Sequence, residues 1–205
     1  WNFSSMSLSL SFLAFLSNST QFLRIFSFSS ISALASSSFK FVSSKKIKSI
    51  NNSQVLFEDY KYEDALLVLK EMIELNTLSL VEKGYVASSI SLMIGYSKDT
   101  RRPTGGSLKL PTRTNSYTLL LPHFTALYHK TTDPNAPIRT IAISFGGIKD
   151  EIYETYDLFT DYKALKKEKN LQLALIEIKH KYGKNAVLKG MNLQKGATMR
   201  ERNQQ

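Results

Sequence analysis

The chain has 205 residues, with 27 Lys and Arg against 17 Asp and Glu and a net charge of +10 at pH 7. It contains no cysteine, which excludes disulfide bonds, thiolate metal ligands and cysteine nucleophiles. The three histidines, His123, His129 and His180, do not have the spacing of a zinc motif, so we expect no metal site. The positive charge favours phosphate backbones or anionic membrane surfaces as binding partners.

The first 49 residues differ in composition from the rest, because Ser, Phe and Leu dominate and no acidic residue precedes Glu58. A signal peptide would need a basic start, which this segment does not have. A transmembrane span would need about 20 nearly continuous apolar residues, and the polar run at 17–21 together with Arg24 interrupts the apolar stretch. An organellar transit peptide fits the Ser-rich, acid-free composition better, although Arg is scarce. We favour the interpretation that residues 1–51 are a low-complexity segment, disordered or not native to the gene product and joined to it by an out-of-frame translation.

A regular pattern of elements begins at Asn52. The expected strands cover residues 54–57, 86–96, 107–110 and 139–145, and the expected helices cover residues 63–83 and 116–129. Alternation of apolar and polar residues defines the strands, and the first helix has acidic residues in its first turn and Gly84 at its end. Pro111 ends the third strand, and Pro122 is an awkward residue in the second helix.

The order β-α-β-β-α-β predicts an α+β domain over residues 52–148, a four-stranded sheet with two helices on one face. Residues 149–205 are expected to form a tail with a basic helix over 171–181. The apolar residues expected to face the helices are Ile90, Ile94, Leu108, Leu110, Ile141, Ile143 and Phe145. The opposite face would stay in contact with water and present mainly small side chains: Ser89, Ser91, Ser107, Lys109, Thr140, Ala142 and Ser144.

Such a face favours contact with nucleic acid. Small hydroxylated side chains can hydrogen-bond phosphate oxygens, and basic residues at the rim would release counterions from DNA. The DNA-binding residues predicted on this basis are Ser89, Ser91, Lys98, Arg101, Arg102, Ser107, Lys109, Arg139, Thr140 and Ser144. We expect contact with the backbone rather than with base edges. A merely solvated sheet face beside a soluble basic loop would have the same composition, so the pattern alone leaves both interpretations open.

Several segments resemble the C-terminal, little-finger region of Y-family translesion DNA polymerases, and the bacterial UV-damage-repair branch in particular. They are residues 95–99 (Gly-Tyr-Ser-Lys-Asp), residues 137–139 (Pro-Ile-Arg) and the tail residues 181–188 and 196–203. The resemblance covers about residues 52–205 and implies the β-α-β-β-α-β fold, with the sheet lying along the template-primer duplex. Relatives continue where this chain stops at Gln205, so we expect truncation at both ends.

Residues after the predicted domain resemble the pentapeptide by which these polymerases dock on the bacterial sliding clamp. They are Thr155, Tyr156, Asp157, Leu158 and Phe159. An exposed Leu-Phe pair can anchor in an apolar pocket while neighbouring polar atoms fix its register. The usual leading Gln of the family is Thr155 here. In the alternative interpretation, Leu158 and Phe159 pack back onto the domain.

Phosphoryl transfer in this family needs palm carboxylates that hold two Mg²⁺ ions. The adjacent acidic pairs of this chain, at 58–59, 63–64 and 150–151, fit a strand exit, a helix start and a solvated loop instead. We therefore expect no catalytic residue, no cofactor in this chain, with Mg²⁺ only in the missing palm, and DNA binding without polymerisation. The expected location is the cytoplasm, at the nucleoid.

Two other hypotheses remain open at this point. The chain could be a stand-alone protein-interaction module without DNA binding, in which case the basic face is incidental. It could also be a membrane-associated protein anchored by its first 49 residues, a hypothesis that we rank last; we expect no membrane partner.

Overall fold

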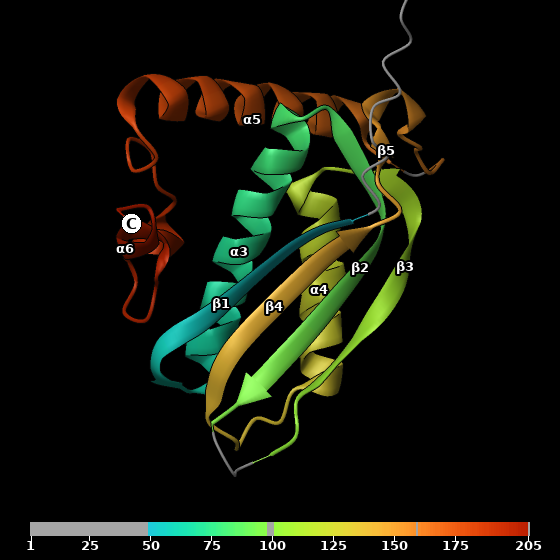
Figure 1. The fold of residues 1–205 in the computed structure, drawn as a ribbon. Helices are drawn as coiled ribbons and strands as arrows, with labels where there is room; N and C mark the ends of the chain where they lie inside the picture. The colour runs from blue at the N-terminus through green and yellow to red at the C-terminus, as the bar shows by residue number, and fades with distance from the viewer. Residues whose placement is uncertain (1–48, 98–100, 159, 205) are drawn as a thin grey trace, which may run out of the picture. The chain divides into compact units, whose positions relative to one another are not determined.

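The fold follows the predicted order of strands and helices. The computed structural model describes residues 49–97, 101–158 and 160–204, so the predictions for residues 1–48, Lys98 and Phe159 lie outside the described residues. The domain consists of β1 (Ser49–Tyr60), α3 (Tyr62–Glu82), β2 (Tyr85–Tyr96), β3 (Thr104–Thr114), α4 (Tyr117–Thr131) and β4 (Ile138–Gly146) (Figure 1). This arrangement confirms the predicted α+β class.

The four long strands form one antiparallel sheet in the order β1-β4-β2-β3. β4 lies between β1 and β2, so β1 and β3 form the two edges of this sheet. The short strand β5 (Lys149–Asp150) pairs separately with Tyr85 and Val86 at the start of β2. This order brings distant residues into register: Ser144 lies opposite Asn51 on one side and Ser91 on the other.

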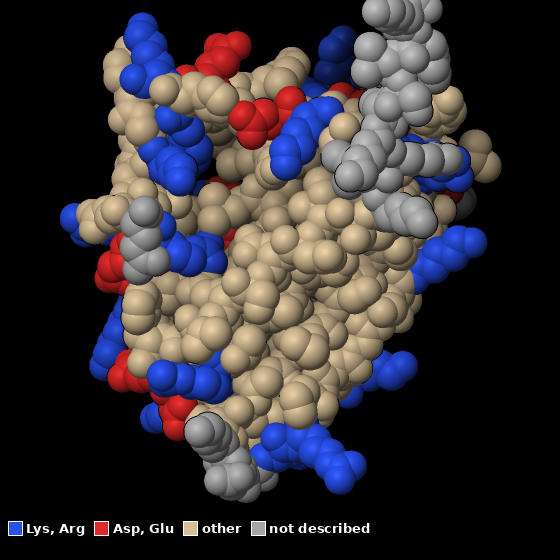
Figure 2. Space-filling model, in the orientation of Figure 1, with Lys and Arg blue, Asp and Glu red and all other residues tan. Residues whose placement is uncertain are grey.

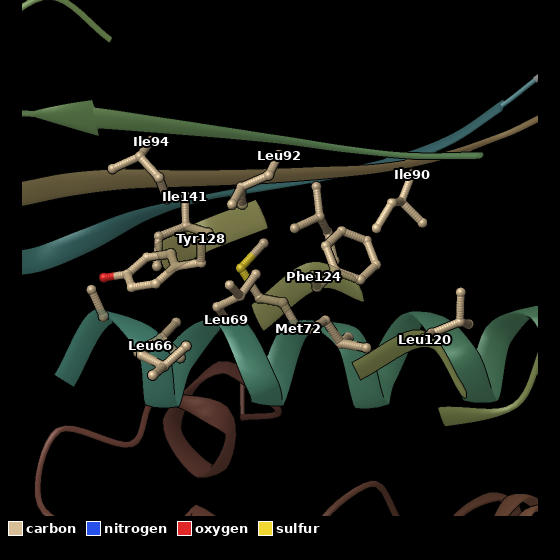
Figure 3. Packing of buried hydrophobic residues seen from close by; sticks show 14 of the residues in the cluster. Leu66, Leu69, Met72, Ile90, Leu92, Ile94, Leu120, Phe124, Tyr128 and Ile141 are labelled. Atoms are coloured by element: carbon tan, nitrogen blue, oxygen red, sulfur yellow. The ribbon is translucent and has the colours of Figure 1, made fainter. Parts of the chain in front are cut away.

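α3 and α4 cover the same face of the sheet, and the hydrophobic core lies between the helices and the strands (Figures 1 and 3). Alternate strand residues such as Ile90, Ile94 and Ile141 are fully buried there. Opposite them lie Leu66, Leu69 and Met72 of α3 and Leu120, Phe124 and Tyr128 of α4. Complete burial of each large apolar side chain stabilises the fold by about 1.5–3 kcal/mol. Of the residues predicted to face the helices, only Leu108 is substantially exposed, at 39%, because it lies on an edge strand.

Two strands, β1 and β3, extend by several residues beyond their predicted limits. β1 begins at Ser49, before the expected domain start at Asn52, because its first residues continue the pairing with β4. β3 continues past Pro111. The proline is tolerated because β3 is an edge strand whose pairing with β2 shifts register between Ala87 and Ser89, so the missing N–H falls in a bulge.

The start of α4 is fixed by two side chains. The Ser116 hydroxyl accepts a hydrogen bond from Leu119 N at 3.2 Å and caps the helix. The same hydroxyl donates to the Glu168 carboxylate at 2.6 Å, and Thr118 N donates to that carboxylate at 3.1 Å. Glu168 comes from a later helix, so this cap also joins the C-terminal part of the chain to the domain.

That later helix, α5 (Tyr162–Tyr182), is longer than the helix expected over 171–181. It starts early because the Asp161 carboxylate caps it, accepting hydrogen bonds from Lys163 N at 2.9 Å and Ala164 N at 3.1 Å. α5 lies across the end of α3 and contacts it (Figure 1). It is therefore part of the fold and not a solvated tail.

The last part of the chain, η2 (Gly190–Leu193) and α6 (Met199–Arg202), docks on α3 through a buried carboxylate. Glu71 of α3 is fully buried and accepts hydrogen bonds from Asn192 Nδ2 at 3.0 Å, Thr198 N at 2.8 Å and Met199 N at 3.1 Å. Two of these donors are consecutive backbone N–H groups at the start of α6, where the helix dipole favours an anion. The Gln54 amide of β1 also donates to the Thr198 hydroxyl at 2.9 Å. The tail is thus held to both α3 and β1.

Replacing Glu71 with Ala should destabilise the protein by about 2–4 kcal/mol, because several buried donors lose their acceptor at once. Urea denaturation measures this change, and limited proteolysis should cut the released tail sooner. Glu82→Ala is the matched control: Glu82 lies on the same helix, is partly exposed, and accepts a hydrogen bond from His180. Glu82→Ala should lower the free energy of unfolding by less than about 1 kcal/mol. Equal losses for the two variants would contradict the assigned role of Glu71.

Candidate nucleic-acid interface

The sheet face opposite α3 and α4 is open and consists of cross-strand rows of side chains. In the strand order β1-β4-β2-β3, the rows are Ser49, Gly146, Ser89 and Lys109; Asn51, Ser144, Ser91 and Ser107; Ser53, Ala142, Met93 and Gly105; and, on the first three strands, Val55, Thr140 and Gly95. The structure therefore places on one face the residues that the alternation predicted there: Ser89, Ser91, Ser107, Lys109, Thr140, Ala142 and Ser144.

These rows contain no carboxylate, and their centre carries no charge (Figure 2). Within the second row, the Ser144 hydroxyl donates to Asn51 Oδ1 at 2.5 Å, and the Ser91 and Ser107 hydroxyl oxygens lie 2.9 Å apart. A depression of about 630 Å³ runs over the second and third rows, where the side chains are small except for Met93. An extended polyanion could approach the sheet here without meeting a carboxylate.

The β1 side of this face was missed from the sequence. Asn51 and Ser53 line the depression, but only residues 54–57 were predicted to form a strand. In the structure, exposed and less exposed positions alternate from Ser49 onward, but the residue types there do not show this alternation. The segment was overlooked because its inward residues, such as Asn52, are polar and do not give the apolar alternation of a half-buried strand.

Gly105 keeps the β3 edge of the depression low. Its φ of +147° lies in a region that favours glycine, and a Cβ added there would lie 2.1 Å from Leu92 O. No side chain fits without displacement of the backbone. The close approach of β3 to β2 at this position therefore depends on glycine.

The basic residues of the predicted interface fall into two groups. Arg101 forms an ion pair with Asp133, and Arg139 Nη1 lies 3.7 Å from Asp59 Oδ1, so both guanidinium groups have an acidic partner within the fold. Arg102 and Lys109 are exposed and have no ion pair among the residues that the structure describes. Lys98, the remaining predicted contact, lies outside the described residues.

The clamp-docking-like segment is anchored at one end and exposed at the other. Thr155 N donates to Arg113 O at 3.1 Å, and Arg113 N donates to the Thr155 hydroxyl at 2.7 Å, which fixes the segment to β3. Thr160 N donates to Asp157 O at 3.1 Å and closes a turn around Leu158, which is 97% exposed. The alternative in which Leu158 packs back onto the domain is therefore wrong; the same interpretation for Phe159 lies outside the described residues.

Tyr156 within this segment turns toward the start of α5. Its hydroxyl donates to Glu154 Oε2 at 2.8 Å, and its ring meets the Tyr162 ring edge-on with centroids 5.6 Å apart. Desolvation, followed by the hydrogen bond to Glu154, raises the pKa of Tyr156 to about 12. The phenol thus remains a neutral hydrogen-bond donor at physiological pH.

Two kinds of feature are absent from the described residues. No helix in that part of the chain is both long and apolar enough to cross a membrane. Nor do those residues contain a group of three or more His, Cys, Asp or Glu side chains that could hold a metal ion.

These features define an α+β domain with two helices on one sheet face and an open, hydroxyl-rich surface on the other. Residues 47–158, more than half of the chain, match the impB/mucB/samB family C-terminal domain. The chain belongs to this family, which confirms the predicted resemblance to the C-terminal region of Y-family DNA polymerases.

Two curated relatives cover similar parts of the chain. UvrX of Bacillus subtilis (strain 168), whose name associates it with UV-damage repair, is 28% identical over 163 residues, which are 75% of this chain and 37% of the relative. DNA polymerase IV of Pelotomaculum thermopropionicum (strain DSM 13744 / JCM 10971 / SI) is 23% identical over 159 residues, which are 77% of this chain and 38% of the relative. The chain spans less than two fifths of the length of these relatives.

Gly105→Ala should destabilise the protein by at least about 2 kcal/mol, because it combines backbone strain with a steric clash against β2. Thermal or urea unfolding measures the loss. Gly190→Ala is the control, since a Cβ at Gly190 meets no atom within 4 Å and its φ lies outside the glycine-favoured region. That variant should remain within about 0.5 kcal/mol of the wild type. A Gly105 variant as stable as the wild type would show that β3 can move away from β2 at little cost.

Proposed function

We propose that this domain binds the sugar-phosphate backbone of template-primer DNA, as the DNA-holding part of a Y-family polymerase that acts in damage bypass. The observation that carries the proposal is the open sheet face: hydroxyl and amide groups in register across four strands, no carboxylate among them, and Lys109 at one corner. DNA polymerase IV and UvrX, to which the chain is similar, have names that point to DNA synthesis and UV-damage repair.

The chemistry of the face suits phosphate better than base edges. Serine hydroxyls and the Asn51 amide can donate to phosphate oxygens, and they are too short to reach far into a groove. Lys109 and Arg102 add charge that is not neutralised by an acidic partner within the described residues. Arg101 and Arg139 would first have to exchange Asp133 and Asp59 for phosphate, so each should contribute less to affinity.

We assign no catalytic residue to this chain. The acidic pairs noted in the sequence have structural partners instead: Asp59 faces Arg139, and Glu151 forms an ion pair with Lys169. Glu63 and Asp64 lie in the first turn of α3, where the helix dipole favours them. On this proposal, Mg²⁺ and the palm carboxylates belong to a different part of the polymerase, and the protein acts in the cytoplasm at the nucleoid.

The DNA-binding proposal predicts a steep salt dependence. Fluorescence anisotropy with labelled primer-template DNA measures the association constant at several salt concentrations. A plot of its logarithm against the logarithm of the salt concentration should fall with a slope of about −0.9 for each phosphate that the protein neutralises. Changing Arg102 and Lys109 together to Ala should lower the slope by about 2 and weaken binding at every salt concentration. The control variant changes Lys167 and Lys181 to Ala. These two exposed lysines lie on α5, outside the sheet, and the control has the same net charge as the Arg102 and Lys109 double variant.

Equal losses for the two double variants would mean that binding follows net charge and that the sheet face is not the contact surface. No binding by the wild type at low salt would favour the alternative, a protein-interaction module without DNA binding.

A second function, docking on the bacterial sliding clamp, is favoured by one separate observation. Leu158 is almost entirely exposed at the tip of a turn whose base Thr155 fixes to β3. Exposure of a large apolar side chain at a fixed position is typical of an anchor residue that a partner's pocket covers. Thr155 replaces the usual Gln, and its hydroxyl is already occupied by the bond to Arg113, so we propose weak docking that tethering on DNA strengthens.

Changing Leu158 and Phe159 together to Ala should abolish measurable binding to the clamp in a surface plasmon resonance assay, while DNA binding stays unchanged. Leu193→Ala removes another exposed leucine outside the segment, 67% exposed, and should bind the clamp like the wild type. Clamp binding that survives the double change would place the contact elsewhere.

A further inference from the structure

One side of α5 carries a row of exposed apolar side chains that the domain does not cover. This helix follows the residues that match the family domain, which end at 158. Leu171 and Tyr182 are 60% and 65% exposed, and Ile178 is 36% exposed. Leu175 lies between them and is half-buried. Steps of four, three and four residues separate the four positions, so they form one line along the helix. This is the spacing with which one helix packs on a second helix.

The domain packs against a different side of α5. Gln172 is buried against the domain, and Glu168 accepts a hydrogen bond from the Ser116 hydroxyl. Gln172 follows Leu171 by one residue, which corresponds to about 100° around the helix. α5 lies along one edge of the fold, across the end of α3 (Figure 1). The apolar row is therefore a free side of this helix, and covering it would recover the free energy that its exposure to water costs.

Positive charge without an acidic partner borders this row. Three exposed lysines on its flank form no ion pair among the described residues: Lys163, Lys167 and Lys181. The Lys181 Nζ atom lies 5.1 Å from the centroid of the Tyr182 ring, directly beside the row. α5 contains six lysines and two glutamates. Glu168 is directed to the domain, and Glu177 lies farther around the helix from the row than the three lysines. The border of the row is therefore basic.

From these observations we propose that α5 binds an acidic amphipathic helix of a partner protein. The apolar row of the partner helix packs on Leu171, Leu175 and Ile178, and its carboxylates face the lysines. The apolar row alone would accept many amphipathic helices. The unpaired lysines select among them, because a flank of opposite charge attracts and a flank of like charge repels.

Other occupants fit the row less well. A second copy of α5 would bring two lysine-rich flanks together, since Lys167 and Lys181 lie near opposite ends of the same helix. DNA would neutralise the lysines and leave the apolar side chains without a contact, because it presents mainly phosphates and sugars. A membrane surface favours a broad apolar face, whereas this row is a single line of side chains.

The test uses the full chain and a fluorescein-labelled synthetic peptide of about three heptads, with leucine at the a and d positions and glutamate at the flanking positions. Two control peptides have the same length. One carries lysine in place of each glutamate, and the other has the composition of the acidic peptide in scrambled order. In fluorescence anisotropy at low salt, the wild type should bind the acidic peptide at least about 10-fold more tightly than either control.

The apolar part of the contact is tested with Leu171 and Tyr182, which are both more than half exposed. Changing the two residues together to Ala should weaken binding of the acidic peptide by about 10-fold or more, because both contacts are lost. Leu173→Ala is the control. Leu173 is 43% exposed on the same helix but lies about 200° around it from Leu171, so this variant should bind like the wild type. Thermal unfolding at the wild-type temperature verifies that the variants fold.

The charged part of the contact is tested with two double variants of equal net charge. Changing Lys167 and Lys181 to Ala should weaken binding of the acidic peptide at low salt and make it less sensitive to added salt. Changing Arg102 and Lys109 to Ala removes the same charge from the sheet domain and should leave peptide binding unchanged. Equal losses for the two variants would show that the peptide follows net charge, which contradicts the proposed site.

Several other results would overturn the inference. The partner is not acidic if the glutamate and lysine peptides bind equally well, and the row binds no such helix if the acidic peptide does not bind at low salt. A dimer in sedimentation that becomes a monomer when Leu171 and Tyr182 are changed to Ala would assign the row to a second copy. Binding to phosphatidylglycerol vesicles that the same change abolishes, without binding of the peptide, would assign it to a membrane surface. DNA enters none of these measurements, so the inference and the proposed function are tested independently.

Discussion

The structure depends on the position of α3 between two layers. One side of this helix buries Leu66, Leu69 and Met72 against the sheet, and the other carries Glu71, which holds the tail. The helix is therefore buried nearly all round. Its apolar side drives the sheet and helices together through water exclusion. Its buried carboxylate can persist there only because the tail supplies hydrogen-bond donors. Without the sheet, the apolar side of α3 would be exposed to water. Without the tail, the Glu71 carboxylate would lose its hydrogen-bond donors.

Covering one face of the sheet leaves the other face open. Two helices span the width of four strands on one side, and the tail and α5 pack against α3, which leaves the opposite rows in contact with solvent. The side chains in those rows are small because of the close pairing of the strands as well as the composition. Gly105 permits β3 to approach β2, and Gly146 lies where a Cβ would come within 2.6 Å of the Ser89 hydroxyl. A shallow, smooth and uncharged surface is the result, with charge at its margins.

The same face combines two chemistries along its length. Hydroxyl and amide groups dominate the rows that contain Asn51 and Ser144, whereas Val55 and Phe57 are exposed toward the end of β1. The tip at Leu158 lies in a different segment, after β4, so clamp docking and DNA binding can be tested independently.

The sequence by itself determined the order of strands and helices and the inward and outward residues of β2 and β4, because alternation is a local property. It also pointed to the family through short segments. Tertiary structure alone decided which charges are available and how the tail is held. Asp133 forms an ion pair with Arg101, and Asp59 faces Arg139. Glu71 accepts hydrogen bonds from Asn192, Thr198 and Met199 of the tail. These partners are far apart along the chain except within the tail, and no local periodicity encodes a contact that forms only when the sheet, α3 and the tail come together.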